Sequence, residues 1–256
     1  MIYANISGSG TPILLIHGFC ETSVIWKDLQ TQLSSSYQII SIDLPGFGKS
    51  KFDSTIQSLD EIADEISNFL LNKNITSCFV IGHSIGGYVA LSLARNYPDM
   101  LLGLGLFHST TFSDDDQKRN IRDKTVEYVE NYGIELWARG FISKLFYSNN
   151  VPKHKKVIQR LEKMASQTPI EVFKAYTTFM KNREDSTDLL GHFHKPIFLI
   201  AGENDVAVPM SQSIFMREQI ANDHSLILAE TGHMGFIERP TECFLFIKSV
   251  LQKNRL

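Results

Sequence analysis

A serine flanked by glycines lies at the centre of the chain's most informative pentapeptide. Gly82-His-Ser-Ile-Gly86 follows the apolar run Cys78–Ile81 and precedes a helix-like stretch. A sharp turn from strand to helix forces its middle residue into strained backbone geometry, and it exposes the serine hydroxyl. Ser84 is therefore a candidate nucleophile. The alternative interpretation is a glycine-rich turn whose serine only caps the following helix.

A serine hydroxyl is a poor nucleophile at neutral pH and needs a base that a buried acid orients. Among eight histidines, His233 suits this role best, because its loop Thr231–Gly235 lies between the last apolar run and the final helix. His83 adjoins the serine, and we expect it to point away in the tight turn. His108 follows another apolar run, where a pocket-lining role and a structural role are both open.

Asp205 is the best candidate for the orienting acid. It directly follows the apolar run Ile197–Ala201, so its carboxylate should be partly buried at the carboxyl end of a strand, where open α/β sheets place their sites. A helix cap for the segment after Pro209 is the alternative. Glu203 and Asp43 are the runner-up acids, although Glu203 comes two residues early and Asp43 more simply fixes its own loop.

Acyl transfer also requires donors for the oxyanion that develops on the substrate. The backbone N–H of Ile85 follows the nucleophile at a helix N-terminus and supplies one donor. The second should come from the loop after the apolar run Ile13–Ile16, where Gly18 lets the backbone turn the N–H of Phe19 toward the site. We also predict that Phe19 and His108 line the substrate pocket, although plain core packing is an alternative for each.

Short apolar runs alternate with amphipathic stretches along the chain and predict the elements that must position these residues. Each run is apolar throughout, as expected of parallel strands that helices cover on both faces. The expected strands are Ile13–Ile16, Gln38–Ile42, Cys78–Ile81, Leu101–Phe107, Ile197–Ala201 and Ser225–Leu228, with one more around Ile2–Ile6. Ser58 and Glu61 form a capping box at the start of a helix. The sequence therefore predicts an α/β fold with a mostly parallel sheet.

The alternation stops between residues 111 and 190. This stretch contains close to half of the charged residues in less than a third of the length, with several helix signals and no convincing strand. We therefore expect a helical insertion at 111–190 and an α/β core formed by residues 1–110 and 191–256.

Composition excludes several classes of protein. The 256 residues are 43% hydrophobic with a net charge of −3, which excludes disorder and argues against nucleic acid as a partner. No apolar run is long enough to span a membrane. The three cysteines lie far apart and indicate a reducing compartment, and we find no signal-peptide pattern, so we expect a cytoplasmic protein. We see no metal-ligand spacing and no phosphate-binding glycine loop, and therefore expect no metal and no cofactor. Oligomeric state is left open.

The combination of motifs resembles the α/β-hydrolase family across most of the chain outside the insertion. The matching segments are Leu15–Gly18, Asp43–Ser50, Gly82–Gly87, Gly202–Asp205 and Gly232–His233. The resemblance implies a Ser84–His233–Asp205 triad, an oxyanion hole of the Phe19 and Ile85 amides, and a helical cap over the pocket. This chain departs from the family pattern in two places. The segment before Ile13 has room for only one strand, around Ile2–Ile6, so the family's usual first strand is missing, and the oxyanion loop reads HGFC rather than HGGG. The second departure argues against bulky tertiary-alcohol esters as substrates.

The type of nucleophile limits the reactions that the site is expected to catalyse. Relatives that open epoxides or displace halides carry Asp at this turn, whereas a serine favours attack on an acyl carbon. We therefore predict hydrolysis of small or medium carboxylic esters through an acyl-Ser84 intermediate. Carbon–carbon bond hydrolases, thioesterases, lactonases and cofactor-free perhydrolases share such a triad and are the alternative enzymes. A non-catalytic protein that uses the pocket to bind a ligand is the alternative from another class.

Overall fold

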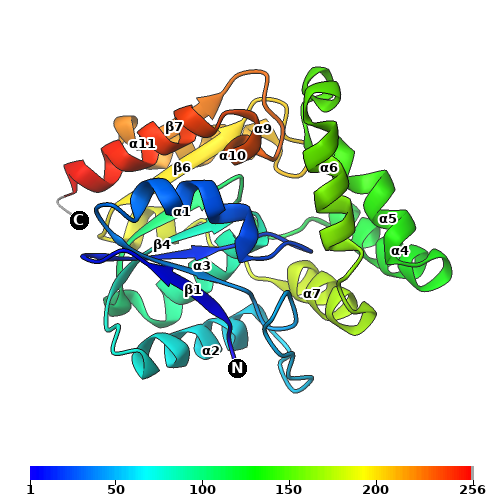
Figure 1. Cartoon of the computed structure of the whole chain (residues 1–256), viewed down its shortest axis with the longest axis horizontal. Coiled ribbons are helices and arrows are strands. Elements are labelled where there is room, and N and C mark those ends of the chain that lie inside the picture. Colours follow the sequence, from blue (N-terminus) through cyan, green and yellow to red (C-terminus); the bar gives the residue numbers. More distant parts are fainter. Residues whose placement is uncertain (255–256) are drawn as a thin grey trace.

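The computed structural model describes residues 1–254. It has a central sheet of seven strands, with helices around it (Figure 1). The strand order is β1-β3-β2-β4-β5-β6-β7. The strands are β1 (Ala4–Ser7), β2 (Pro12–Ile16), β3 (Gln38–Ile42), β4 (Cys78–His83), β5 (Leu101–Phe107), β6 (Ile197–Gly202) and β7 (Ser225–Leu228). Strand β1 pairs antiparallel with β3, and the other neighbours pair in parallel. The predicted α/β fold with a mostly parallel sheet is confirmed.

Helices cover both faces of this sheet and fill the connections between strands. Their bounds are α1 (Lys27–Leu33), α2 (Leu59–Asn72), α3 (Ile85–Asn96), α4 (Asp116–Tyr132), α5 (Ile134–Phe141), α6 (Val151–Ala165), α7 (Ile170–Asn182), α8 (Leu189–His192), α9 (Met210–Gln219), α10 (Gly235–Glu238) and α11 (Pro240–Lys253). Within the described residues, none of them is both long and apolar enough to cross a membrane.

The apolar strands are buried because each face of the sheet packs on its own set of helices. Successive side chains of a strand point to opposite faces. In β2, Leu14 and Ile16 belong to the cluster that includes α2 and α3, whereas Ile13 and Leu15 belong to the cluster that includes α1 and α11. All four side chains are fully buried. The continuous apolar runs therefore correctly predict strands that helices cover on both faces of the sheet.

The local start signal at Ser58 also works as the sequence predicts. Ser58 has extended backbone geometry, and its side-chain oxygen accepts a hydrogen bond from the backbone N–H of Glu61 at 3.2 Å. The Glu61 carboxylate reaches back one residue further than a capping box requires, to the N–H of Gln57 at 2.8 Å. Both contacts satisfy amides near the start of α2 that have no intrahelical acceptor.

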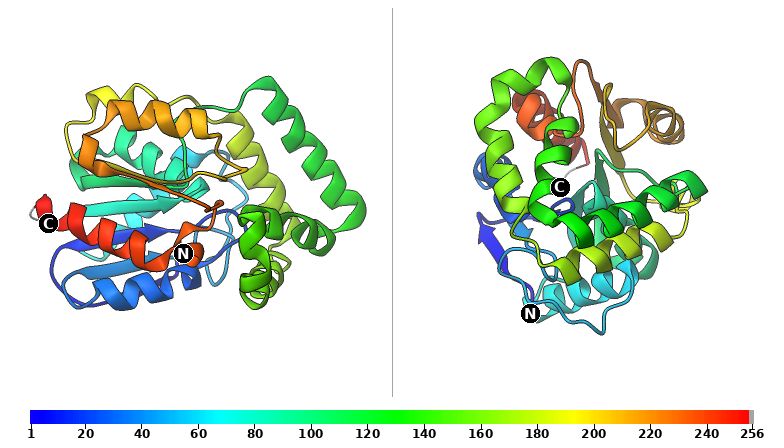
Figure 2. Two further views of the ribbon diagram at one scale, coloured as in Figure 1. Left: turned by 90° about the horizontal axis from the view of Figure 1, so that it is seen from above. Right: turned by 90° about the vertical axis from the view of Figure 1, so that its right-hand side faces the viewer.

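Helices α4, α5, α6 and α7, which lie between β5 and β6 in the chain, stand apart from the sheet (Figures 1 and 2). We call α4, α5, α6 and α7 the cap helices. Helix α4 contacts α5 and α7, and α5 contacts α6. They occupy the segment that the sequence predicts to be a helical insertion, and the described part of that segment contains no strand.

Helix α7 carries the main aromatic contact between the cap helices and the core. The fully buried ring of Tyr176 meets Phe47 edge to face, with ring centroids 4.7 Å apart. Its hydroxyl donates a hydrogen bond to the carbonyl oxygen of Pro45 at 2.9 Å. Phe173, one turn earlier, packs against Phe19 with ring centroids 4.9 Å apart. The cap helices are thus anchored beside the loops that follow β2 and β3.

Removing the Tyr176 hydroxyl tests this anchor. The Tyr176→Phe variant keeps the ring but leaves the buried Pro45 carbonyl without its donor, and we expect it to lower the free energy of unfolding by about 1–2 kcal/mol. Tyr132→Phe is the matched control, because Tyr132 is 64% exposed and should change stability by less than about 0.5 kcal/mol. Urea unfolding measures both. Equal effects of the two substitutions would contradict a stabilising role for the buried hydrogen bond.

Candidate active site

Ser84 lies on a strained turn between β4 and α3. Its backbone has φ 52° and ψ −119°, a left-handed region that residues other than glycine seldom adopt. Gly82 and Gly86 allow the turn, because a Cβ on Gly82 would lie 2.1 Å from the carbonyl oxygen of Gly86. The amide of Ser84 donates to the carbonyl oxygen of Phe107 in β5 at 3.0 Å, which ties the turn to the sheet. The turn therefore presents the serine as the sequence predicts.

Asp205 and His233 meet from two different loops. Asp205 follows β6, His233 follows β7, and Nδ1 of His233 lies 2.8 Å from Oδ2 of Asp205. The other carboxylate oxygen accepts from the amides of Ala207 and Val208 at 2.8 and 3.0 Å. Since Asp205 is ionised, the proton of His233 sits on Nδ1, and Nε2 keeps the lone pair that a general base needs.

The environment keeps Asp205 charged although its side chain is only 1% exposed. Burial alone would raise the pKa of this carboxyl group. The positive charge that His233 carries when it is protonated and the hydrogen bonds from His108 and His233 outweigh burial and hold the pKa of Asp205 far below its usual range. The carboxylate is therefore ionised at neutral pH. The rejected acids lie elsewhere: Glu203 is exposed, and Asp43 accepts from the loop amides of Ser23 and Lys49.

One cavity brings the predicted residues together. It has a volume of about 310 Å³, and both Ser84 and His233 line it, as does Phe19. Trp137, Phe141, Leu145 and Met180 contribute apolar wall from the cap helices and the segments beside them. Asp205 does not line the cavity and lies behind His233. Ser84, His233 and Phe19 therefore lie where our sequence analysis expects them.

His108 corrects our expectation for the pocket. It is fully buried, does not line the cavity, and places Nδ1 3.1 Å from Oδ2 of Asp205. Its Nε2 accepts a hydrogen bond from the amide of Gly235 at 3.2 Å, so the proton is on Nδ1 and is donated to Asp205. Burial lowers the pKa of His108 to about 4 despite the adjacent carboxylate. His108 is thus a neutral second donor to the acid rather than a pocket residue.

The two amides predicted for the oxyanion hole have no acceptor within the described residues. Ile85 is the first residue of α3, so its N–H has no intrahelical partner. No hydrogen bond from the Phe19 amide occurs in residues 1–254. The preceding amide of Gly18 donates to Oε2 of Glu21 at 2.7 Å, which fixes the loop. Both amides are free to donate, and their role in an oxyanion hole stays a prediction.

A buried ion pair lies beneath the site, and the sequence gives no signal for it. Nδ1 of His83 is 2.9 Å from Oε2 of Glu21, and Nε2 donates to the carbonyl oxygen of His233 at 3.0 Å. Burial would lower the pKa of His83, but the charge of Glu21 and its hydrogen bond raise it. The pKa of Glu21 is lowered in spite of burial, because His83 balances its charge. An imidazolium therefore connects the loop of Gly18 and Phe19 to the loop of His233.

The cluster of His108, Asp205 and His233 has the composition of a metal site, with potential ligand atoms within 4.8 Å of one another. Both imidazoles, however, direct their Nδ1 protons at the same carboxylate oxygen. The lone pair on Nε2 of His108 is already used by the amide of Gly235. The groups are arranged to hydrogen-bond one another, and this arrangement does not fit a bound cation.

The arrangement of Ser84, His233 and Asp205 on this sheet is the one that the resemblance to α/β hydrolases implies. The profile described as "alpha/beta hydrolase fold" matches residues 11–132. An uncharacterised hydrolase of Bacillus subtilis is 28% identical over 236 residues, which cover 89% of this chain and 85% of that protein. A pimeloyl-[acyl-carrier protein] methyl ester esterase of Nitrosomonas europaea is 26% identical over 256 residues, covering 95% and 98%.

The fold has a close match among solved structures as well. A thermophilic esterase from Thermogutta terrifontis, solved with malate bound, superimposes with a TM-score of 0.91 at 28% identity. The match covers all of this chain and 94% of the other. The chain has the α/β-hydrolase fold over its whole length, and its residues 11–132 match the model of that family.

The close approach inside the serine turn gives a prediction about stability. In Gly82→Ala the new methyl group would clash with the backbone of Gly86, so we expect the free energy of unfolding to fall by about 2 kcal/mol or more. Gly140→Ala is the control: Gly140 lies in α5 with nothing within 4 Å of the added Cβ, and helix propensity should stabilise it by up to about 1 kcal/mol. Chemical unfolding measures both. A tolerated Gly82→Ala would contradict the described turn.

The second donor on Asp205 gives a prediction about catalysis. His108→Leu removes the donor, and we expect kcat/KM to fall by about tenfold or more and the acid side of the pH–rate profile to move. His108→Asn can place an N–H near the same oxygen and tolerates the positive φ of 48°, so it should retain most activity and the wild-type profile. Indistinguishable profiles for wild type and His108→Leu would mean that His108 only fills space.

Proposed function

We propose that the protein hydrolyses carboxylic esters through an acyl-Ser84 intermediate. The observation that carries this proposal is the 2.8 Å contact of His233 with the ionised Asp205, at the wall of the same cavity in which the strained turn presents Ser84. A protein that only binds a ligand has no need of an oriented imidazole in the same cavity as a serine on a strained turn. The geometry thus favours catalysis over the binding alternative.

The reaction has two halves in this proposal. Oγ of Ser84 attacks the ester carbonyl carbon while Nε2 of His233 takes its proton, and the carbon–oxygen bond to the alcohol then breaks as the same proton passes to the leaving oxygen. Water repeats the attack on the acyl-Ser84, His233 again moves the proton, and the carboxylic acid leaves. Asp205 stays ionised throughout and stabilises the imidazolium that forms in each half.

The remaining residues support these steps. The amides of Phe19 and Ile85 would stabilise the oxyanion, each contributing on the order of 3 kcal/mol to lowering the barrier. Residues 111–190, with the cap helices, would act as a lid over the core formed by 1–110 and 191–256. Their apolar side chains in the cavity, among them Trp137 and Phe141, suit an acyl or alkyl chain of small or medium length.

The names of two relatives support an ester as the bond that is cleaved. The Nitrosomonas europaea protein is named a methyl ester esterase, and the Thermogutta terrifontis structure is described as an esterase. Both align over nearly the whole of this chain. No residue described above favours a carbon–carbon bond, a thioester or a lactone over a simple ester.

We also propose a cytoplasmic location. Cys20, Cys78 and Cys243 are all buried and free, and burial raises the pKa of each thiol above its ordinary value. Thiols of this kind are inert core groups and need no oxidising compartment.

Replacing the nucleophile tests the proposal. We expect Ser84→Ala to lose at least about 10⁴-fold in kcat on p-nitrophenyl esters from acetate to dodecanoate, and to lose labelling by a fluorophosphonate probe. Ser54→Ala is the control, because Ser54 is exposed and does not line the cavity.

Three outcomes would count against the proposal in different ways. Activity that survives in Ser84→Ala would remove Ser84 as nucleophile. A wild-type protein that neither labels nor turns over any ester would overturn the proposed function as a whole. Strong labelling with slow turnover of every ester would move the proposal to another acyl substrate of the same triad.

A further inference from the structure

The wall of the catalytic cavity that α4 forms carries two cationic side chains. Lys118 and Arg122 lie one turn apart on this helix and line the same cavity as Ser84 and His233. Glu21 is the single acidic residue among the described lining residues, and His83 already balances its charge at 2.9 Å. The cavity therefore has an excess of positive charge on the side of the cap helices.

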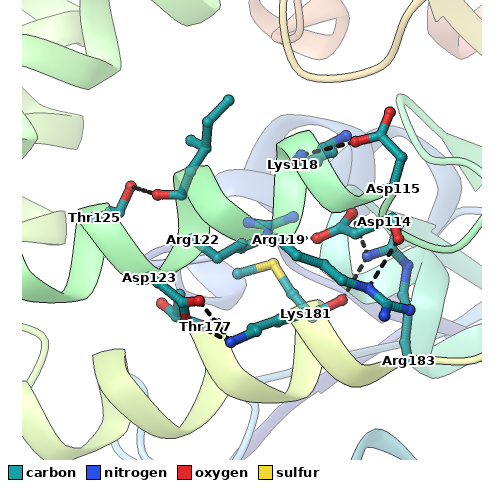
Figure 3. A network of polar contacts seen from close by, with 12 residues as sticks. Asp114, Asp115, Lys118, Arg119, Arg122, Asp123, Thr125, Thr177, Lys181 and Arg183 are labelled. Carbon is teal, nitrogen blue, oxygen red and sulfur yellow. Dashed lines mark hydrogen bonds and ion pairs between the residues drawn. The ribbon is translucent and has the colours of Figure 1, made fainter.

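The contacts of Arg122 leave part of its charge uncompensated. Its Nε donates to Oδ2 of Asp114 at 2.8 Å, while Nη1 of Arg183 donates to Oδ1 of the same carboxylate at 2.7 Å (Figure 3). Asp114 has no exposed side-chain surface, and Arg183 is 7% exposed. Burial would raise the pKa of Asp114, but the two guanidinium groups hold it below its usual value. The Asp114 carboxylate thus contacts two cations, of which Arg183 also interacts with the charge of Asp185.

The terminal nitrogens of Arg122 are the available donors of this group. Arg183 uses its own nitrogens on Asp114 and on the carbonyl oxygens of Met180 and Phe112. For Arg122, the contact of Nε with Asp114 is the single side-chain hydrogen bond within residues 1–254. Its side chain is 19% exposed and lines the cavity. The Nη groups can therefore donate to a ligand in the cavity.

Lys118 has no acidic partner in the described part of the chain. Its Nζ donates to the carbonyl oxygen of Ala207 at 2.9 Å, which is a neutral acceptor. The neighbouring Asp115 accepts from the backbone amide of Lys118, as the N-cap of α4, and not from its ammonium group. A half-buried ammonium without a counter-charge is costly, and a bound anion would remove that cost.

We propose that the cavity selects esters that also carry a carboxylate at the far end of an apolar chain, such as half-esters of dicarboxylic acids. This inference rests on the proposed function. Lys118 and Arg122 bind the carboxylate through charge-assisted hydrogen bonds, the apolar wall with Ile121, Trp137 and Phe141 contacts the chain, and Ser84 attacks the ester carbonyl. The two cations thereby determine which end of the substrate reaches the serine.

Paired esters test the selectivity. Wild type should hydrolyse monomethyl adipate with a kcat/KM at least about tenfold above that for dimethyl adipate, mainly through KM. We expect Lys118→Gln and Arg122→Gln each to reduce this ratio by about tenfold, whereas Lys124→Gln, on the exposed side of α4, leaves it unchanged. Because Arg122→Gln also removes the ion pair with Asp114 and can disturb folding, Lys118→Met serves as a second variant at the other cation. An unchanged ratio in both Lys118 variants would overturn the proposal.

A binding measurement separates this inference from the proposed function. Calorimetry of adipate with the Ser84→Ala protein requires no turnover. We expect binding that weakens with added salt and weakens by about tenfold or more in Ser84→Ala combined with Lys118→Gln. If adipate does not bind while neutral esters are hydrolysed, the anion site is wrong and the hydrolase stands. If adipate binds in this way while no ester is hydrolysed, the anion site stands and the proposed reaction is wrong.

Discussion

The buried charge of Asp205 is the constraint on which the rest of the site depends. An ionised carboxylate with a side chain 1% exposed is stable in a protein interior only when hydrogen bonds replace its water. Four N–H groups do so here: the amides of Ala207 and Val208, and Nδ1 of His108 and His233. These donors come from the ends of β5, β6 and β7. Satisfying one charge therefore fixes three loops, and with them the orientation of the imidazole that lines the cavity.

The ion pair of Glu21 and His83 has the corresponding role on the other side of the serine. Glu21 accepts from the amide of Gly18, in the loop that carries the predicted oxyanion donor, and His83 donates to the backbone of His233. Because His83 precedes Ser84 in the turn, these contacts connect the loops of Gly18, Ser84 and His233. Each of the two buried carboxylates is thus stabilised by hydrogen bonds from segments that are far apart in sequence, and these hydrogen bonds hold the segments together. From α4, Nζ of Lys118 donates to the carbonyl oxygen of Ala207, whose amide in turn holds Asp205, and the cap helices also set the shape and charge of the cavity.

The strands, the helix after Ser58 and the turn at Ser84 could be predicted from the sequence, because the signals for them are local. Apolar runs gave the strands, the capping residues at Ser58 located a helix, and glycine spacing located the turn at Ser84. The position of His108 could not be predicted, since a histidine after a strand can face a pocket or the core, and only the location of Asp205 across the sheet decides which. The pairing of Glu21 with His83 joins residues 62 positions apart, and no pattern along the chain reports such a contact. The position of Lys118 could not be predicted either, because its place in the cavity depends on how α4 packs against the rest of the protein.

The central claim is that Asp205 and His233 activate Ser84 for covalent catalysis, and trapping the intermediate tests it most directly. The wild-type protein would be mixed with p-nitrophenyl butyrate, quenched in acid within the first turnovers and digested for mass spectrometry. We expect a butyryl group on the peptide that contains Ser84, and on no other peptide. Rapid release of p-nitrophenol without an acylated Ser84, or with the butyryl group on a different residue, would contradict it.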